Sequence, residues 1–592
     1  MVLVAHLALA QTVVFFPKSL PKRGLLAALA ILPILGLLQA HHLPSWKAEG
    51  ALSDCGNDDI LTCAVHPVLV LAAAARSEVS AMVQKQSKTL SSAVAQYKSR
   101  YKRPPPPGFD VWFELAVQND FLLVDEFDVM MESLEPFWGL PPLDVRSRAE
   151  SALASSPDDL SWFNIQDHEM DWGNGSPAGW MGQEVFSWFS PEILAIMPDV
   201  RFVVNVLDEP RVSVAHDALE GALRAANESL KSHASDEWMD SAGANKVQVD
   251  FHREGKQRAW EDLVLSCPLD SPCRIESNAD SMNNTGPDQF FVRTSARSKD
   301  VCSHPSLREQ HGFFSTAETL PLTRTLVPIF SQAKPSSFQD LLYPSPYYPA
   351  KYRQNEYVEA DDIDWILKEN KLYWTGSTTG GHTTVDNWQH FHRQRMYLLT
   401  HSKSEQQITL LQSPSEHDSA WTPYTTNMSS VASLFETRIT AVIQCDSPAC
   451  DIQREAFDVD EEEHKDQLSK SYQYKFNLDI DGNGFSGRFY RLLHSKAVPV
   501  KQTIFKEWHD DWLIPWAHYI PLSMEMTELP EMMRFLATTE EGLETSKVIA
   551  EDGAAWARKA LRQNDLVLVF VRILLEYARI VSPDRANLNC CD

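Results

Sequence analysis

The most informative pattern of apolar and polar positions lies in the last quarter of the chain. Phe476 to Ile480 has the character of a strand and ends in a turn that carries three glycines between Gly482 and Gly487. A helix-like segment follows, with Arg488 and Arg491 in its first turns, and Ala497 to Val500 reads as a second strand. The order of strand, glycine turn, helix and strand predicts a unit that presents backbone N–H groups and a helix N-terminus to a phosphate.

The glycine turn carries the residue types that a nucleotide or sugar-nucleotide site requires. Glycines let the backbone approach a ligand, and the Arg488 side chain can pair bidentately with phosphate oxygens. The Ser486 hydroxyl and the N–H groups of the turn are further donors. Asp479 and Asp481 can together hold a divalent metal, although a turn-capping role for Asp481 is favoured. The alternative is an ordinary βαβ unit with a glycine turn and no ligand.

Other segments predict the elements around this unit. Arg201 to Val206 has the continuous apolar character of a buried strand, and Leu372 to Trp374 is another short strand. Aromatic and acidic residues recur at helical spacing from Phe109 to Leu153, which predicts packed helices, and Val68 to Lys98 is predicted to be one helical stretch. Leu566 to Ile580 is strongly apolar, but its interspersed charges predict a core-packed terminal helix rather than a membrane span.

Three blocks of sequence resemble one protein family and occur in that family's order. DGNGFSGRFYRLL followed by EWHDDWLIPWAHYIPL is similar to the pattern of the CAP10-type glycosyltransferases (glycosyltransferase family 90). These include the fungal capsule-associated xylosyltransferases and the animal protein O-glucosyltransferases. LYWTGSTTGG (Leu372 to Gly381) resembles the family's Y-x-R-G-S motif, and MPDVRFVVNVLDEPRV (Met197 to Val212) resembles its P-D-x-x-x-x-x-N-x-x-D segment. The matching residues of the first block are Asp481, Gly482, Ser486, Arg488, Phe489, Lys501, Glu507, Trp508, Pro515, Trp516, His518, Tyr519 and Pro521.

The resemblance implies an α/β fold of the GT-B type, in which two Rossmann-like domains face a cleft, here preceded by an N-terminal membrane anchor and a stem. It also implies an inverting glycosyltransferase that moves a sugar from a UDP-sugar donor to a hydroxyl of a glycan or protein acceptor. A catalytically inactive sugar-nucleotide- or glycan-binding scaffold on the same fold is the alternative. The predicted boundaries are 1–45 for the cytoplasmic tail and signal anchor, 46–104 for the stem, 105–340 for the domain with the base, 341–560 for the nucleotide-sugar-binding domain and 561–592 for a C-terminal helix.

The resemblance also assigns roles to individual residues. Asp208 is implied to be the base that accepts the proton of the acceptor hydroxyl, and an Asp is already ionised at neutral pH. Glu209 is a rival carboxylate one residue away. Arg488 is implied to clamp the diphosphate, and Glu507 is a candidate acceptor for a ribose hydroxyl. The predicted nucleotide-sugar-binding residues are Gly376, Ser377, Thr378, Asp481, Gly482, Ser486, Arg488 and Glu507.

The second block departs from the animal glucosyltransferases, because Thr375 and Thr378 stand where those enzymes have arginines. This change leaves less positive charge against a diphosphate. A divalent cation such as Mn2+, or a side chain from elsewhere such as Lys501 or Arg393, can compensate. The sequence therefore predicts no certain cofactor and no defined metal ligands. The TGSTTGG and LDIDGNGFSGRF forms resemble the fungal branch, so xylose is the first expectation for the donor sugar, with glucose and mannose left open.

Composition excludes one class of partner. The chain has 592 residues, with 80 acidic and 53 basic residues and a formal net charge of −27. Binding to nucleic acid requires a basic face, so no nucleic-acid partner is expected. The hydrophobic content of 44% is that of an ordinary globular protein, and Trp508, Trp516 and Tyr519 are predicted to be core residues.

The N-terminus carries a targeting pattern. Lys18, Lys22 and Arg23 precede an apolar run from Gly24 to Leu38, which becomes a marginal membrane span when extended through Leu43. The basic cluster predicts a cytoplasmic N-terminus and a lumenal catalytic part, as in a single-pass type II protein of the Golgi or endoplasmic reticulum membrane. A cleaved signal peptide and a hairpin of two apolar runs are the alternatives.

Cysteines and sequons also fit a lumenal compartment. Of nine cysteines, Cys445 and Cys450 can close a short loop, while Cys267, Cys273 and Cys302 lie in one loop-rich region. Zinc is the competing interpretation, although the chain has no paired C-x-x-C sites. Glycosylation sequons occur at Asn227, Asn283 and Asn427, and at Asn174, where a following Pro weakens the signal.

Overall fold

The fold is known from a computed structural model of the chain. The described residues are 64–173, 179–232, 247–275, 290–349, 356–401, 406–414, 420–459, 466–585 and 587–591. The predicted anchor lies outside them, as do the sequons at Asn174 and Asn283. Within the described ranges, no helix is both long enough and apolar enough to cross a membrane.

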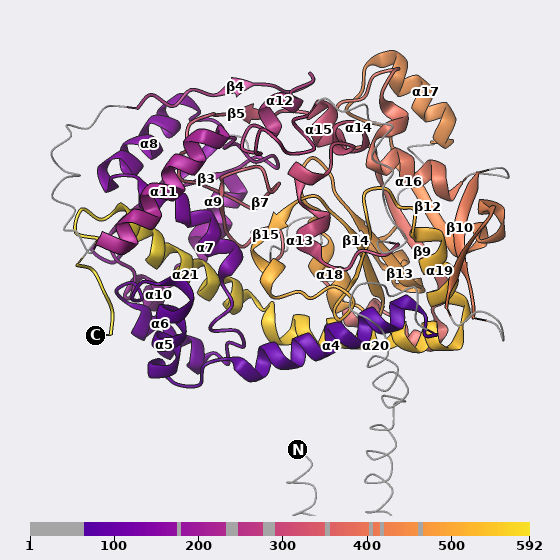
Figure 1. Cartoon of the computed structure of the whole chain (residues 1–592), viewed down its shortest axis with the longest axis horizontal. Coiled ribbons are helices and arrows are strands. Elements are labelled where there is room, and N and C mark those ends of the chain that lie inside the picture. Colours follow the sequence, from indigo (N-terminus) through magenta and orange to yellow (C-terminus); the bar gives the residue numbers. More distant parts are fainter. Residues whose placement is uncertain are drawn as a thin grey trace, which may run out of the picture.

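Two five-stranded sheets organise the chain (Figure 1). The first sheet has the strand order β2-β1-β3-β6-β8, and β1 runs antiparallel to both β2 and β3. Strands β3, β6 and β8 run parallel to one another, so this sheet is mixed. The predicted strand near residues 201–206 is confirmed as β3. The bounds are β1 Leu160–Gln166, β2 Glu169–Gly173, β3 Val200–Asn205, β6 Ile329–Ser331 and β8 Leu341–Leu342.

The second sheet is wholly parallel, in the order β12-β9-β13-β14-β16. Its strands are β9 Glu369–Ser377, β12 Phe435–Ala441, β13 Tyr474–Ile480, β14 Val498–Gln502 and β16 Ile520–Pro521. The predicted order of strand, glycine turn, helix and strand is confirmed by β13, α18 (Phe489–His494) and β14. Every residue of β13 is buried, as is usual for a central parallel strand covered on both faces. An α/β fold is thus established.

Long helices cover these sheets. Helix α20 packs against α18, α19, β14 and α4, and Figure 1 shows α4 and α20 together along one edge of the molecule. The predicted single helix from Val68 to Lys98 is wrong, because Thr89 ends the run by capping a second helix through a reciprocal pair with Ser92. The bounds are α4 Pro67–Lys85, α5 Leu90–Tyr101, α6 Phe109–Gln118, α7 Asp128–Leu134, α8 Pro142–Ser155, α11 His216–Ser232, α16 His392–Thr400, α17 Ser447–Phe457, α19 Leu529–Thr538, α20 Glu540–Ala560 and α21 Gln563–Val581.

Short elements fill the connections between the longer ones. The short helices are α9 Gly179–Ser187, α10 Pro191–Leu194, α12 Trp260–Leu263, α13 Ser295–Ser298, α14 Leu307–Gln310 and α15 Gly312–Thr316. The short strands are β4 His252–Arg253, β5 Pro321–Leu322, β7 Ala333–Lys334, β10 Gln407–Gln412, β11 Thr422–Asn427 and β15 Lys506–Glu507.

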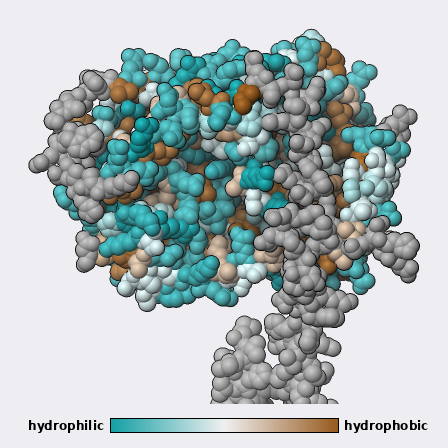
Figure 2. All heavy atoms as spheres, in the orientation of Figure 1, coloured by the Kyte–Doolittle hydropathy of each residue, from teal (hydrophilic) through white to brown (hydrophobic). Residues whose placement is uncertain are grey.

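The apolar side chains gather in three clusters. One lies around the first sheet and includes most of α21, so the end of the chain returns to the first sheet, and the predicted core-packed terminal helix is confirmed. A second lies around the parallel sheet, and a third, smaller cluster contains Phe313, Phe314 and Phe505. Trp508, Trp516 and Tyr519 are buried, as predicted. The described residues on the face in Figure 2 are mostly hydrophilic, with scattered hydrophobic residues.

Candidate functional site

The loops that follow β3, β9 and β13 meet at one place. Each leaves the C-terminal end of a parallel-paired strand, which is where ligands bind in α/β sheets. Gly484, in the turn after β13, lies directly against the loop after β3: a methyl group at Gly484 would be 2.4 Å from the carbonyl oxygen of Asp208. The same turn meets the loop after β9, because Asn483 Oδ1 accepts the N–H of Gly380 at 3.1 Å. The first and third sequence blocks therefore touch.

Asp208 and Glu209 lie in different environments. The Asp208 side chain is exposed, whereas Glu209 is 2% exposed and accepts the N–H of Thr319 at 3.2 Å. Burial, reinforced by the neighbouring charge of Asp208, raises the pKa of Glu209 to about 7. Asp208 is therefore the carboxylate of the two that a ligand from solvent can reach.

Close backbone contacts fix the loop after β9. Gly380 and Gly381 have φ values of +123° and +142°, which side chains other than glycine rarely adopt. A methyl group at Gly312 would lie 1.9 Å from the carbonyl oxygen of Gly380. Gly380 also lies against the ring of His392, where an added methyl group would come within 2.5 Å. This loop is held by backbone packing that only glycine permits.

Arg393 ties the ends of β9 and β13 together. Its guanidinium donates to the carbonyl oxygens of Asp481 at 2.7 Å, Ser377 at 3.0 Å and Ile480 at 3.2 Å. It is buried, and burial, followed by repulsion from Arg488, lowers its pKa to about 9. Among the described residues, no carboxylate forms an ion pair with it, so it places a positive charge beneath the two loops.

Arg488 is the second guanidinium here. It directly precedes α18, is half-buried, and donates to the carbonyl oxygen of Thr375 at 2.9 Å. Burial lowers its pKa, and the charge of Asp479 opposes this effect. Arg393 and Arg488 are close enough to repel each other, which favours an anion between or above them.

Lys501 does not add to this charge, because two carboxylates neutralise it. Its Nζ lies 2.9 Å from Asp479 Oδ2 and 3.3 Å from Glu507 Oε1, and all three side chains are buried. Burial opposes its charge, yet Asp479 and Glu507 raise the pKa of Lys501. Glu507 is also the acceptor for the Tyr348 hydroxyl and is fully buried. Of the two compensating cations predicted from sequence, only Arg393 remains without a carboxylate partner among the described residues.

Asp481 links the glycine turn to the core rather than capping its own turn. Its Oδ2 accepts the N–H of Ile504 at 2.9 Å and lies 3.4 Å from His311 Nε2. His311 stacks on His392 with ring centroids 3.9 Å apart, and the ring of His392 is bound to the carbonyl oxygen of Asp481 at 2.9 Å. Burial raises the pKa of Asp481 to about 7 and lowers that of His311 to about 3, so this histidine is neutral.

The remaining predicted residues divide into two groups. Gly482 lies beside Arg393, and Ser377 Oγ is 3.3 Å from Thr379 Oγ1, which also contacts Arg393. Thr378 turns away, because it is fully buried and its hydroxyl exchanges hydrogen bonds with the backbone of Ile443. Gly376 is the penultimate residue of β9 and packs on Trp374, and Ser486 is buried.

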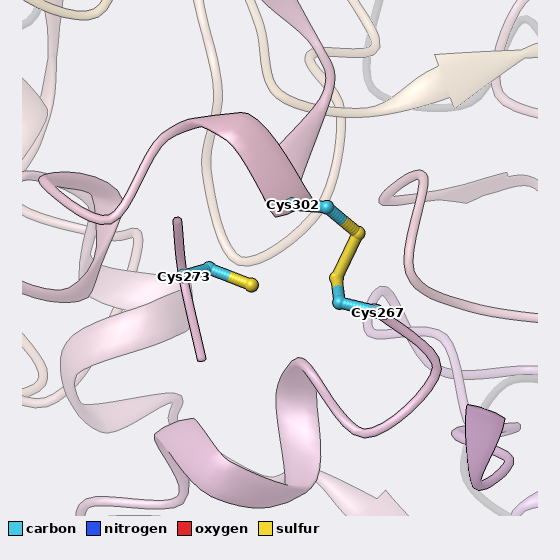
Figure 3. A group of neighbouring side chains, drawn as sticks. All are labelled: Cys267, Cys273 and Cys302. Atoms are coloured by element: carbon cyan, nitrogen blue, oxygen red, sulfur yellow. A yellow bond between two sulfur atoms is a disulfide. The ribbon is translucent and has the colours of Figure 1, made fainter. Parts of the chain in front are cut away.

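Among the described cysteines, three disulfides are formed. The expected Cys445–Cys450 bond is present, and Cys590 is bonded to Cys591. Cys267 and Cys302 form a disulfide beside the free thiol of Cys273 (Figure 3). The three sulfur atoms lie within 4.8 Å of one another, but the disulfide occupies two of them. The geometry therefore favours a structural disulfide over zinc at this position.

Some residues of the site carry no signal in the sequence. Asn205 belongs to the third block, but nothing in its spacing indicates that its amide organises the loop around Asp208. His311 and Gly312 lie in a polar, loop-rich segment without a motif. Asn483 is one of many turn residues until its contact with Gly380 is seen. These residues act through contacts between distant segments.

Comparison with known proteins gives a consistent result. Residues 322–586 match the family described as Glycosyl transferase family 90. Human protein O-glucosyltransferase 1 is 21% identical over 276 residues, which are 43% of this chain and 58% of that protein. Protein O-glucosyltransferase 3 of Rattus norvegicus is 29% identical over 108 residues, or 18% of this chain and 21% of that protein.

The similarity is partial in extent. Protein O-glucosyltransferase 2 of Danio rerio is 27% identical over 110 residues, covering 18% of this chain and 21% of that protein. Each match thus covers less than two thirds of the relative's own length. The resemblance that the motifs indicate and the family match agree over the glycine turn and α18. Residues 322–586 of the chain thus match glycosyl transferase family 90, and the chain is similar to the protein O-glucosyltransferases.

Proposed function

We propose that the protein is an inverting glycosyltransferase that moves a sugar, xylose or glucose, from a UDP-sugar to a hydroxyl of a glycan or protein. In this proposal the two sheets form the halves of a GT-B arrangement. The loop after β3 supplies the base, and the loops after β9 and β13 hold the donor. The observation that carries the proposal is the contact between Gly484 and Asp208, because it puts the candidate base beside the candidate diphosphate site.

The reaction is a single in-line displacement. Asp208 takes the proton of the acceptor hydroxyl while its oxygen forms a bond to the anomeric carbon of the sugar. The bond from that carbon to the diphosphate breaks, and UDP leaves with the electron pair. Arg488, the charge of Arg393 and the N–H groups of the glycine turn stabilise the negative charge that develops on the diphosphate.

The residues present do not fit a resident Mn2+. Asp479 and Asp481 each have one buried oxygen without a hydrogen-bond partner, and oxygen is the donor that Mn2+ prefers. However, Lys501 already neutralises Asp479, and the groups of three or more metal-binding side chains found among the described residues contain cysteines instead. In this proposal Arg393 and Arg488, rather than a metal ion, balance the negative charge of the diphosphate.

The direct test is a screen of the purified protein against UDP-sugars and GDP-sugars, with and without Mn2+. We expect UDP-xylose or UDP-glucose to raise the melting temperature and to be hydrolysed slowly in the absence of an acceptor. Binding of UDP without transfer or hydrolysis would favour the alternative, an inactive sugar-nucleotide- or glycan-binding scaffold. Stabilisation by GDP-sugars alone would contradict the proposed donor class.

Gly484→Ala should lower turnover by at least about tenfold, because the added methyl group must displace the backbone of Asp208 and proton transfer depends steeply on geometry. Gly221→Ala is the matched control, since Gly221 lies in α11 with nothing within 4 Å of an added methyl group. We expect that variant to keep full turnover and to be as stable or slightly more stable. Steady-state kinetics and thermal unfolding of the two variants distinguish the effects. If Gly484→Ala and Gly221→Ala had equal turnover, the contact between Gly484 and Asp208 would have no role in the reaction, contrary to the proposal.

We also propose a lumenal location, in the Golgi or endoplasmic reticulum, with the membrane as a partner through the N-terminal anchor. The sequons at Asn227 and Asn427 are exposed, so oligosaccharides could be attached at both. Disulfides such as Cys267–Cys302 persist in oxidising compartments. Protection of the described part from protease in intact vesicles, and its loss on adding detergent, tests this orientation.

A further inference from the structure

A chain of buried hydrogen bonds runs beneath the loop that carries Asp208. Asn205, the last residue of β3, is 1% exposed. Its Nδ2 donates to the carbonyl oxygen of Glu209 at 2.8 Å, and its Oδ1 accepts the N–H of Leu207 at 3.1 Å. The amide of Asn205 therefore closes the turn on both sides of Asp208.

The same amide is anchored in the first sheet. Asn205 Nδ2 also donates to Ser331 Oγ at 3.1 Å, and Ser331 Oγ donates to Asp340 Oδ1 at 2.6 Å. The Ser331 hydroxyl has one proton and donates it to Asp340, so its oxygen accepts the hydrogen bond from Asn205 through a lone pair. The direction of each bond is thereby fixed, from the Asn205 amide through Ser331 to the carboxylate.

Asp340 then holds the polypeptide backbone that follows Asp208. Its Oδ1 accepts the N–H of Arg211 and its Oδ2 accepts that of Val212, both at 2.9 Å. Asp340 is fully buried, and these bonds to its carboxylate offset part of the rise in its pKa that burial causes. Arg211 is itself fully buried and bound to Asp159, so the far side of the loop cannot shift freely.

We propose that Asn205, Ser331 and Asp340 are positioning residues for Asp208 in the reaction proposed above. These three side chains hold the backbone before and after Asp208 through hydrogen bonds. The Asp208 side chain itself stays exposed, as a base that meets an acceptor must be. A base must come within about 2.6–3.2 Å of the proton it removes, and a displacement of about 1 Å can cost about 100-fold in rate. The inference rests on the proposed function for its catalytic consequence, whereas the restraint on the loop can be measured without any substrate.

Ser331→Ala and Ser337→Ala form a matched pair for the test. Ser337 is a fully buried serine nearby in the sequence, and its hydroxyl donates to the carbonyl oxygen of Leu263 at 2.6 Å, away from the Asp208 loop. Each variant removes one buried hydroxyl, so both should lose similar stability. Ser331→Ala should lower kcat about 10- to 100-fold with UDP affinity unchanged, whereas Ser337→Ala should keep kcat.

Two further variants separate positioning from loss of the fold. Ser331→Thr keeps the hydroxyl and should recover most of the turnover that Ser331→Ala loses. Asn205→Asp has almost the same shape but loses the two amide protons that bond to Glu209 and Ser331, so it should lower kcat at least as much as Ser331→Ala. Neither change touches the donor-binding loops, and UDP affinity should stay at the wild-type value in both.

Hydrogen exchange gives the readout that does not depend on activity. The backbone amides of the loop should exchange at least about tenfold faster in Ser331→Ala and Asn205→Asp, but not in Ser337→Ala. The amides to follow are those of Leu207, Asp208, Glu209, Arg211 and Val212. Unchanged exchange there would overturn the inference, as would equal kcat values for Ser331→Ala and Ser337→Ala. If the wild-type protein transfers no sugar from any donor, the proposed function fails, and exchange alone decides whether the chain of hydrogen bonds restrains the loop.

Discussion

Asp208→Asn is expected to abolish sugar transfer while leaving UDP binding almost unchanged. Asn has nearly the same shape as Asp but cannot accept the proton of the acceptor hydroxyl, and loss of a general base costs about 10²–10⁴-fold in rate. The side chain is exposed and lies in a loop that contacts Gly484, so the change leaves the core intact. Transfer assays at saturating donor and calorimetric titration with UDP measure the two properties. Asp208→Glu should also be slow, because the longer side chain moves the carboxylate out of line.

Glu209→Gln is the matched control for that substitution. Glu209 is buried, its pKa is raised to about 7, and Gln resembles its protonated form. Near neutral pH, where part of the population is already protonated, we expect a small change in turnover. If Asp208→Asn kept a large fraction of wild-type turnover and Glu209→Gln lost it, Glu209 rather than Asp208 would be the base. Normal turnover in both variants would contradict the proposed displacement mechanism.

Arg488→Ala should weaken UDP binding by about 2–4 kcal/mol, or roughly 30- to 1000-fold in Kd. The half-buried guanidinium lies at the N-terminus of α18, beside the glycine turn and close to Arg393. Removing it takes away a charge-assisted contact to the diphosphate and also its bond to Thr375. Lys at this position should recover only part of the affinity, because an ammonium cannot make two parallel bonds to a phosphate. Isothermal titration with UDP gives the value directly.

Arg491→Ala is the control on the same helix. Arg491 is buried one turn further on, where it donates to Ser471 Oγ at 3.4 Å and lies over the ring of Tyr472. Its loss should lower the melting temperature without changing the affinity for UDP. If Arg488→Ala were folded and bound UDP as tightly as the wild type, the role of Arg488 would be purely structural.

The sequence alone determined the elements on which the site is built. The glycine turn between β13 and α18 was readable because strand character, glycines and helix spacing are local properties that neighbouring residues express together. The same applies to β3 and to α21, whose interspersed charges distinguish it from a membrane span. The break between α4 and α5 was missed because Thr89 acts as a cap only when the chain turns there.

Only the tertiary structure decided which polar residues meet and which are neutralised. Lys501 and Arg393 looked equally able to replace the missing arginines, yet Lys501 lies between Asp479 and Glu507, while Arg393 bonds to backbone carbonyls and keeps its charge beneath the loops. The resemblance implied Asp208 as the base, with Glu209 as an adjacent rival, and only packing exposed the first carboxylate and buried the second. Periodicity records which face of an element is apolar, but it holds no information about which distant segment covers that face. The partners of a buried charge therefore appear only when the sheets and their loops are packed together.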